Sequence, residues 1–230
     1  MTLLLITILF ALLNWFMVTR PTRIGVWVTK PAVMVFLIAW VMSRSAFPAF
    51  MDSPERFSLV WFLLGLVFSL AGDVFLMLDA KFFPYGLGAF SLTHLCYLLG
   101  FGQLPPAREN WLPAAALAVF TLVIYGLLTF RLCRGLEARA KPAAKLPAAL
   151  YLLLVTLTLY SALLSWFDTR WEASASLVAV WGAALFYFSD GLNAWRRCFG
   201  AAPHDEVRIM ATYHIGQIAL ATAALMRFIW

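Results

Sequence analysis

Charged residues are scarce in this 230-residue chain, since Asp, Glu, Lys and Arg make up only 12% of it. Cysteine is scarce too: Cys96, Cys133 and Cys198 are odd in number and lack the spacing of a metal site or a disulfide framework. Long polar stretches are also missing, which leaves no room for a soluble domain. The chain is instead 63% hydrophobic, with ten Trp and twenty Phe. This composition is typical of a membrane protein.

The chain contains a series of long apolar runs separated by short polar breaks. A run of about 18 or more apolar residues can cross a hydrocarbon core roughly 30 Å thick as a helix. Continuous runs favour helices over barrel strands, which would alternate over about ten residues. We therefore predict an all-α, polytopic bundle of about eight transmembrane helices that forms a single domain over residues 1–230. The predicted spans are 2–18, 24–43, 57–78, 83–102, 111–130, 147–167, 174–197 and 206–229.

Lys and Arg are unevenly distributed over the connections between these spans. Eleven of them fall on one side of the membrane and five on the other. Because cytoplasmic loops carry the excess of basic residues, both termini are predicted to face away from the cytoplasm. The first span is predicted to be a retained helix rather than a signal peptide, since Arg20 and Arg23 follow it. The short, Ala- and Trp-rich chain favours a bacterial inner membrane.

The net charge of the chain is +6. We interpret this charge as a signal of topology and of contact with lipid headgroups. It does not indicate nucleic acid as a partner, because no basic face lies outside the membrane to bind it.

The polar residues inside the predicted spans gather in one half of the bilayer. Ionisable groups at membrane depth are costly and tend to face the bundle interior, so each is a functional candidate. Structural polar residues in helices of alternating direction would instead appear at both depths. We therefore predict one shared cavity that opens to the cytoplasmic side. The residues concerned are Lys30, Asp73, His94, Asp190, Tyr213, His214 and Gln217.

Helical spacing places several of these residues on common faces. Gly65, Ser69 and Asp73 follow one another at four-residue intervals, so the carboxylate shares its face with small residues. Tyr213 and Gln217 are one turn apart. These faces are predicted to meet the polar faces of two other spans. The polar faces consist of Gly86, Phe90 or Ser91, His94 and Tyr97 in span 83–102, and of Asp190, Asn193 and Arg197 in span 174–197.

The charged residues also have a purely structural interpretation. Lys30 can extend its ammonium to the cytoplasmic headgroups. Asp73 and Asp190 can be structural partners of Lys30 and Arg197. Arg197, next to Arg196 and close to a Trp, is first of all a candidate anchor at the membrane interface.

Five short motifs combine small, polar and aromatic residues along the chain. They are Lys30-Pro31, Gly72-Asp73, GAFSLTHLCY from residue 88, GAALFYFSD from residue 182 and TYHIGQ from residue 212. In this order and spacing, over most of the chain from residue 30 to 217, they resemble the lysoplasmalogenase, or YhhN-like, family. The resemblance implies an eight-helix membrane hydrolase that cleaves the vinyl ether bond of lysoplasmalogens. The products would be a fatty aldehyde and glycerophosphoethanolamine or glycerophosphocholine.

Vinyl ether hydrolysis begins with protonation of the alkene carbon, and water then adds to the oxocarbenium ion. The reaction needs no metal or other cofactor. It needs a carboxylic acid that stays protonated, which burial in a low dielectric favours, and a nearby anion that stabilises the cation and activates water. Asp73 and Asp190 suit these two roles, and Arg197 near Asp190 favours the ionised form of that carboxylate.

We accordingly expect a lysophospholipid substrate, the lipid bilayer and no obligate protein partner. The catalytic candidates are Asp73, Asp190 and His94. The candidates for orienting water and the glycerol hydroxyl, or for binding the phosphate and the rest of the substrate, are Lys30, Ser91, Asn193, Arg197, Tyr213 and Gln217. His214 departs from the residue type that the resemblance leads us to expect after Tyr213, so it receives no catalytic role. We favour a packing role for it, and packing is a competing interpretation for His94.

A metal-dependent membrane lipid amidase or lipase is one alternative. It would use His94, His214, Asp73 and Asp190 as zinc ligands, whereas His204 is predicted to lie in a loop.

A small proton-coupled transporter is another alternative, because transporters also bury ionisable residues near a cavity. Its polar groups should continue through the outer half of the membrane, where we place only Asn14 and Tyr125. A purely structural helix bundle is the third alternative.

Overall fold

The computed structural model describes residues 1–20, 23–45, 54–102 and 108–229, and of residues 54–56 only the backbone. Within these ranges the chain forms eight α-helices, short 3₁₀ turns and no strand. The helices are α1 Thr2–Met17, α2 Arg23–Arg44, α3 Pro54–Met77, α4 Phe83–Phe101, α5 Trp111–Ala138, α6 Lys145–Leu164, α7 Ala173–Phe199 and α8 Asp205–Phe228.

The predicted helical bundle is confirmed, and most helix ends fall within about three residues of the predicted ones. The exception is α5, which continues to Ala138 instead of ending at residue 130. Residues such as Leu, Arg, Glu and Ala propagate a helix in water as well as in lipid, so its basic end does not stop it. Seven of the described helices are long and apolar enough to cross a membrane. The eighth, α1, has 16 residues and a length of about 24 Å.

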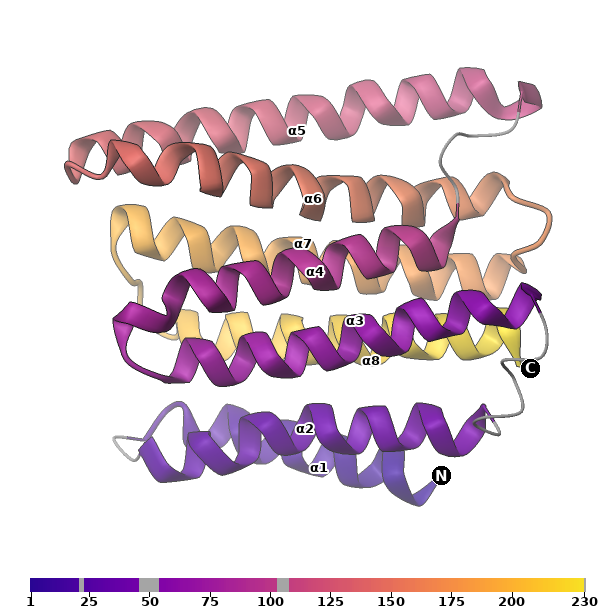
Figure 1. Cartoon of the computed structure of the whole chain (residues 1–230), viewed down its shortest axis with the longest axis horizontal. Coiled ribbons are helices and arrows are strands. Elements are labelled where there is room, and N and C mark those ends of the chain that lie inside the picture. The colour runs from indigo at the N-terminus through magenta and orange to yellow at the C-terminus, as the bar shows by residue number, and fades with distance from the viewer. Residues whose placement is uncertain (21–22, 46–53, 103–107, 230) are drawn as a thin grey trace.

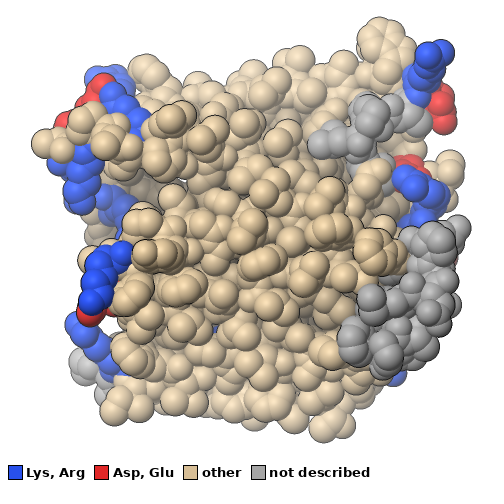
Figure 2. Space-filling model, in the orientation of Figure 1, with Lys and Arg blue, Asp and Glu red and all other residues tan. Residues whose placement is uncertain are grey.

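The helices lie side by side with alternating directions (Figure 1). The connections α1–α2, α3–α4, α5–α6 and α7–α8 lie at one end of the bundle, and both termini lie at the other. Figure 2 shows an uncharged belt between Lys and Arg side chains at the two ends. Apolar helices with this arrangement make the chain a multi-pass membrane protein. The end with the α1–α2 connection is the one predicted to face the cytoplasm.

Glycine allows α7 and α8 to pack closely. A Cβ atom added at Gly216 would lie 2.9 Å from the carbonyl oxygen of Gly182, and one at Gly182 would lie 2.9 Å from the Leu220 nitrogen. Small residues let membrane helices approach backbone to backbone. This contact fixes the position of α8, which carries Tyr213 and Gln217, against α7, which carries Asp190.

Gly216→Ala is expected to destabilise the bundle, because the added methyl group meets backbone atoms that cannot rotate away. Overpacking of this kind costs about 1–3 kcal/mol. The matched control is Gly126→Ala in α5, where nothing lies within 4 Å of the added Cβ. The control should be neutral or slightly stabilising, because Ala favours a helix over Gly by about 1 kcal/mol. Thermal unfolding in detergent measures both; equal midpoints for the two variants would contradict the close contact.

Candidate active site

Asp73 forms a buried ion pair on α3. The Lys30 ammonium of α2 lies 3.0 Å from Asp73 Oδ1, and the Tyr213 hydroxyl of α8 donates to Oδ2 at 2.7 Å. Asp73 is only 1% exposed. Both partners stabilise negative charge on this carboxylate. Lys30 therefore turns inward to Asp73, as in the structural interpretation of this pair, and does not extend to the headgroups.

A hydrogen-bonded network continues from this ion pair across three helices. Gln217 of α8 donates from Nε2 to Ser69 Oγ at 2.8 Å and accepts from the hydroxyl of Tyr97 of α4. The Ser69 and Thr93 hydroxyls are 3.1 Å apart. Tyr213 interacts with Gln217, which joins this network to Asp73. The polar faces of α3, α4 and α8 thus meet as their spacing predicts.

Asp190 of α7 belongs to a second centre. Its Oδ2 lies 3.2 Å from Nε2 of His94, whose Nδ1 lies 3.1 Å from the Thr158 hydroxyl of α6. The Asp190 side chain is 10% exposed and that of His94 is 1% exposed. Tyr151 packs edge-on against the His94 ring, with centroids 5.8 Å apart, and also interacts with Asp190.

Both ring nitrogens of His94 have a hydrogen-bond partner. The Thr158 hydroxyl can give its one proton either to the Leu154 carbonyl at 3.1 Å or to His94 Nδ1. Nδ1 therefore donates to the Thr158 oxygen in the first case and accepts from the Thr158 hydroxyl in the second. In both cases one proton lies between Nε2 of His94 and Oδ2 of Asp190.

Phe186 of α7 lies between the two centres. Its ring centroid is 4.8 Å from that of His94 and 5.4 Å from that of Tyr213. Asp73 and Asp190 are close enough to interact electrostatically across it. The predicted convergence of these residues in one half of the bundle is thus observed. Packed side chains, rather than an open shared cavity, surround Asp73, His94 and Tyr213, which are all buried.

Three of the predicted substrate-binding residues lie outside these networks. The Ser91 hydroxyl donates within its own helix to the Leu87 carbonyl at 2.9 Å. Asn193 is half-buried, one turn beyond Asp190. Arg197 is exposed and its guanidinium lies 4.4 Å from the centroid of the Phe83 ring. Among the described basic side chains, the partner of Asp190 is therefore His94 and not Arg197.

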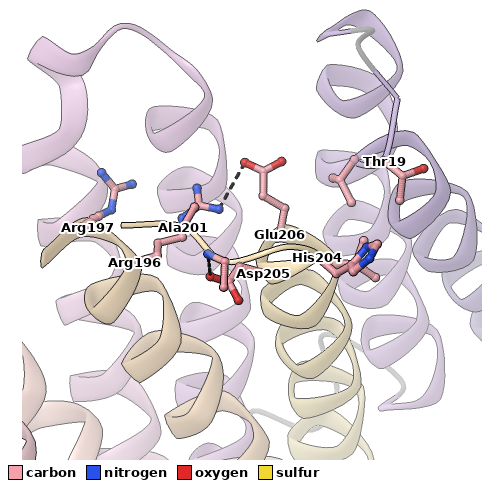
Figure 3. Close-up of a pocket in the computed structure, with 10 residues that line it drawn as sticks. Thr19, Arg196, Arg197, Ala201, His204, Asp205 and Glu206 are labelled. Atoms are coloured by element: carbon pink, nitrogen blue, oxygen red, sulfur yellow. Dashed lines mark hydrogen bonds and ion pairs between the residues drawn. The ribbon is translucent and has the colours of Figure 1, made fainter. Parts of the chain in front are cut away.

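A cavity of about 530 Å³ lies at the α7–α8 connection (Figure 3). Arg196 and Arg197 of α7 line it, together with Val18 and Thr19 after α1 and residues 201, 202 and 204–207. Arg196 Nη1 lies 3.2 Å from Glu206 Oε1. Asp205 accepts a hydrogen bond from the Ala202 backbone N–H at 2.7 Å. Arg197 follows Asp190 by about two helical turns, roughly 10 Å.

His214 does not join either carboxylate centre by a hydrogen bond. Its Nδ1 accepts from the Trp15 indole of α1 at 3.1 Å. The four residues of the zinc alternative, His94, Asp190, Asp73 and His214, therefore fall into three separate groups. Within the described ranges no three His, Cys, Asp or Glu residues are placed to hold a metal ion.

The placement of Asn14 and Tyr125 in the outer half of the membrane is wrong. Asn14 Nδ2 donates to the Thr29 hydroxyl at 2.9 Å, next to Lys30 and therefore at the depth of the site. Tyr125 lies midway along α5 and reaches toward the Ala149 carbonyl near the start of α6. A transporter would need a polar path through the outer half of the membrane, and neither Asn14 nor Tyr125 contributes to such a path.

Sequence reasoning missed three partners of the site, namely Trp15, Thr158 and Tyr151. Thr and Tyr in an apolar span, and Trp near a helix end, are common in membrane proteins and give no signal by themselves. Tyr97 and Ser69 were recognised as members of polar stripes, because their spacing to His94 and Asp73 is helical.

Comparisons with known proteins place this geometry in context. The model of the YhhN family matches residues 25–224. The chain is 32% identical to lysoplasmalogenase TMEM86B of Mus musculus over 215 residues, which are 93% of this chain and 80% of that protein. It is 31% identical to the Rattus norvegicus protein of the same name, over 93% and 78% of the two chains. It is 32% identical to lysoplasmalogenase TMEM86A of Homo sapiens, over 70% and 64%. No solved structure matches the chain significantly.

Proposed function

This chain belongs to the YhhN family, and from that premise we propose that it hydrolyses the vinyl ether bond of lysoplasmalogens within the membrane. The products are a fatty aldehyde and glycerophosphoethanolamine or glycerophosphocholine. The names of the curated relatives support the substrate. The observation that carries the chemistry is the contact of 3.2 Å between His94 Nε2 and Asp190 Oδ2 in a largely buried site.

In this proposal the His94–Asp190 pair is the general acid. It gives its proton to the alkene carbon that is not bonded to oxygen. The electron pair of the double bond forms the new C–H bond, and the ether oxygen shares the positive charge of the resulting oxocarbenium ion. A positioned acid of this kind contributes about 10²- to 10⁴-fold to a rate. Thr158 fixes the orientation of the His94 ring.

Asp73 is the anion that stabilises this cation. Lys30 and Tyr213 hold its carboxylate, and it acts on Asp190 across the Phe186 ring. The face of Phe186 adds a further favourable interaction, because aromatic faces attract cations. This division of roles between two carboxylates follows from their different partners.

Water completes the reaction. It adds to the carbon that bears the positive charge, and one of its protons returns to the His94–Asp190 pair. The hemiacetal that results loses the glycerol oxygen as an alcohol and becomes the aldehyde. The sum is one vinyl ether and one water giving one aldehyde and one alcohol, with the acid regenerated and no cofactor consumed.

The phosphate of the substrate binds at the cavity near the α7–α8 connection. Arg197 and Arg196 supply charged donors there, as phosphate recognition requires. The distance of roughly 10 Å along α7 to Asp190 suits a glycerophosphate whose alkenyl chain enters the aromatic interior. Asn193 lies between these two positions. The proposal includes the predicted bacterial inner membrane, with this cavity on the cytoplasmic side.

The test is to incubate purified protein with lysoplasmenylethanolamine and, separately, with its ester-linked analogue. We expect fatty aldehyde from the first and no fatty acid from the second. In D₂O the aldehyde, reduced at once with borohydride, should carry one deuterium on the carbon next to the former carbonyl carbon. Fatty acid alone would instead indicate the metal-dependent lipase, and no product from either lipid would favour the transporter.

A further inference from the structure

The buried imidazole of His214 leaves one of its nitrogens without a partner. The Trp15 indole N–H can only donate, so Nδ1 of His214 accepts and the neutral ring carries its proton on Nε2. His214 is 0% exposed. No described residue accepts a hydrogen bond from Nε2. A buried N–H donor therefore points away from Trp15 with nothing to receive it.

Asn14 leaves an acceptor without a partner in the same region. The Thr29 hydroxyl donates to the Gly25 carbonyl at 2.7 Å, so its oxygen accepts from Asn14 Nδ2 and fixes the orientation of the amide. Oδ1 of Asn14 is buried and has no donor among the residues that the structure describes. Asn14 is 0% exposed.

Both residues lie where α1 packs against its neighbours, Asn14 against α2 and Trp15 against His214 of α8. Asn14 and Trp15 are neighbours in α1, Thr29 is the neighbour of Lys30 in α2, and Lys30 interacts electrostatically with His214. Buried polar groups in native proteins are almost always hydrogen-bonded to protein or to ordered water. The unpaired donor of His214 and the unpaired acceptor of Asn14 therefore each require a partner.

The cavity at the α7–α8 connection lies farther along the same helix faces. Val18 follows Asn14 by four residues and Val207 precedes His214 by seven, so each lies on the same helix face as its partner. Val18 and Val207 both line the cavity. The separation along the helices is about 6–10 Å. A group bound between α1 and α8 would thus lie about one to two helical turns from the cavity.

We propose that His214 Nε2–H and Asn14 Oδ1 form a buried binding site for a hydroxyl group. A hydroxyl accepts one hydrogen bond and donates another, which matches one unpaired donor and one unpaired acceptor. A carboxylate has no proton to donate to Asn14 Oδ1, and an ammonium has no lone pair to accept the hydrogen bond of His214 Nε2–H. The hydroxyl belongs either to water or to the free hydroxyl on glycerol carbon 2 of the lysolipid, and the second case rests on the proposed function.

The first experiment measures kcat/KM for lysoplasmenylethanolamine and for an analogue that lacks the hydroxyl on carbon 2. If the lysolipid hydroxyl occupies the site, the protein prefers the natural lipid by about tenfold or more, the effect of one well-made hydrogen bond. Asn14→Leu then removes this preference, because kcat/KM for the natural lipid falls to the value for the deoxy analogue. The matched control is Thr7→Val, also in α1 and buried, whose hydroxyl bonds its own helix at Leu3.

The second experiment tests directly for bound water and does not require the protein to be active on lysoplasmalogens. If water occupies the site, an experimental structure in lipid shows one ordered water within hydrogen-bond distance of Asn14 Oδ1 and His214 Nε2. Asn14→Leu then lowers the thermal midpoint more than Thr7→Val does. The lipid preference is unchanged in that case.

The proposal is overturned if no ordered water is found, the lipid preference survives in Asn14→Leu and that variant is more stable than the wild type. A wild-type protein that cleaves neither lipid would refute the proposed function alone. The search for water and the stability of Asn14→Leu would still decide whether the hydroxyl site exists.

Discussion

Asp190→Asn is expected to lower the rate of aldehyde formation by about 10²- to 10⁴-fold, the contribution of a general acid. The amide has the shape of the carboxyl group and can still form a hydrogen bond with His94 Nε2, either as donor or as acceptor. It cannot exchange the proton that the His94–Asp190 pair shares. The fold should therefore survive while proton transfer to carbon is lost. The measurement is the initial rate of aldehyde formation, with thermal unfolding of the same sample.

The matched control is Asp79→Asn, which removes an exposed carboxylate just beyond the end of α3. It should leave both the rate and the stability unchanged. Asp73→Asn is a less direct test, because it also leaves the buried Lys30 without its anion. An Asp190→Asn protein that produces aldehyde at the wild-type rate would show that this carboxyl group is not the acid.

Lys30→Met is expected to destabilise the protein by about 3–5 kcal/mol, because it leaves Asp73 as an uncompensated buried charge. The Met side chain fills the space of the Lys stem, so packing changes little. Adding Asp73→Asn to Lys30→Met should restore most of the lost stability, because an amide can accept the Tyr213 hydrogen bond without carrying charge. Thermal or chemical unfolding in detergent gives the free energy of unfolding for each variant.

Lys81→Met is the control for this experiment, since Lys81 is exposed at the α3–α4 connection. Surface substitutions of this kind change stability by less than about 0.5 kcal/mol. A Lys30→Met protein as stable as the control, with no further gain from Asp73→Asn, would contradict the buried ion pair.

The fold of this chain follows largely from its sequence, because lipid forces each apolar run to satisfy its backbone within one helix. The eight helices were therefore predictable, as were most of their ends. The end of α5 was not, since Arg131 and Arg134 mark the membrane surface and say nothing about where the helix stops. The order of the helices across the bundle depends on how their surfaces pack, for example at Gly182 and Gly216. No pattern in the sequence shows which helix surfaces will pack together.

The depth at which the candidate residues gather was predictable from the sequence, but their pairings were not. Helical spacing placed Asp73 with Ser69 on one face, and both are part of the observed network. The structural interpretation of Asp190 paired it with Arg197 on the same helix, whereas the structure pairs Asp190 with His94 of α4. A sequence shows which residues share a helix face, but the rotation of one helix against another decides which faces meet.

The contact of Trp15 with His214 shows the same limit most clearly. The two residues are 199 positions apart in the chain. α1, which supplies the indole, lies outside the range matched by the YhhN family model. A packing role for His214 agreed with its apolar surroundings. Only the hydrogen bond to Nδ1 reveals that its other nitrogen is a donor in need of a partner.

The ion pair between α2 and α3 also bears on how the protein is made. A lysine that enters the bilayer alone costs about 2.5–3.5 kcal/mol during insertion, and its anion must follow to offset this cost. Asp73 lies in the very next helix, 43 residues later, so a ribosome adding about 5–20 residues per second delivers it within seconds. α2 and α3 can therefore leave the translocon as a neutral hairpin. His94 and Asp190 are farther apart in the chain and can pair later, because neither side chain needs a permanent charge before the helices have packed together.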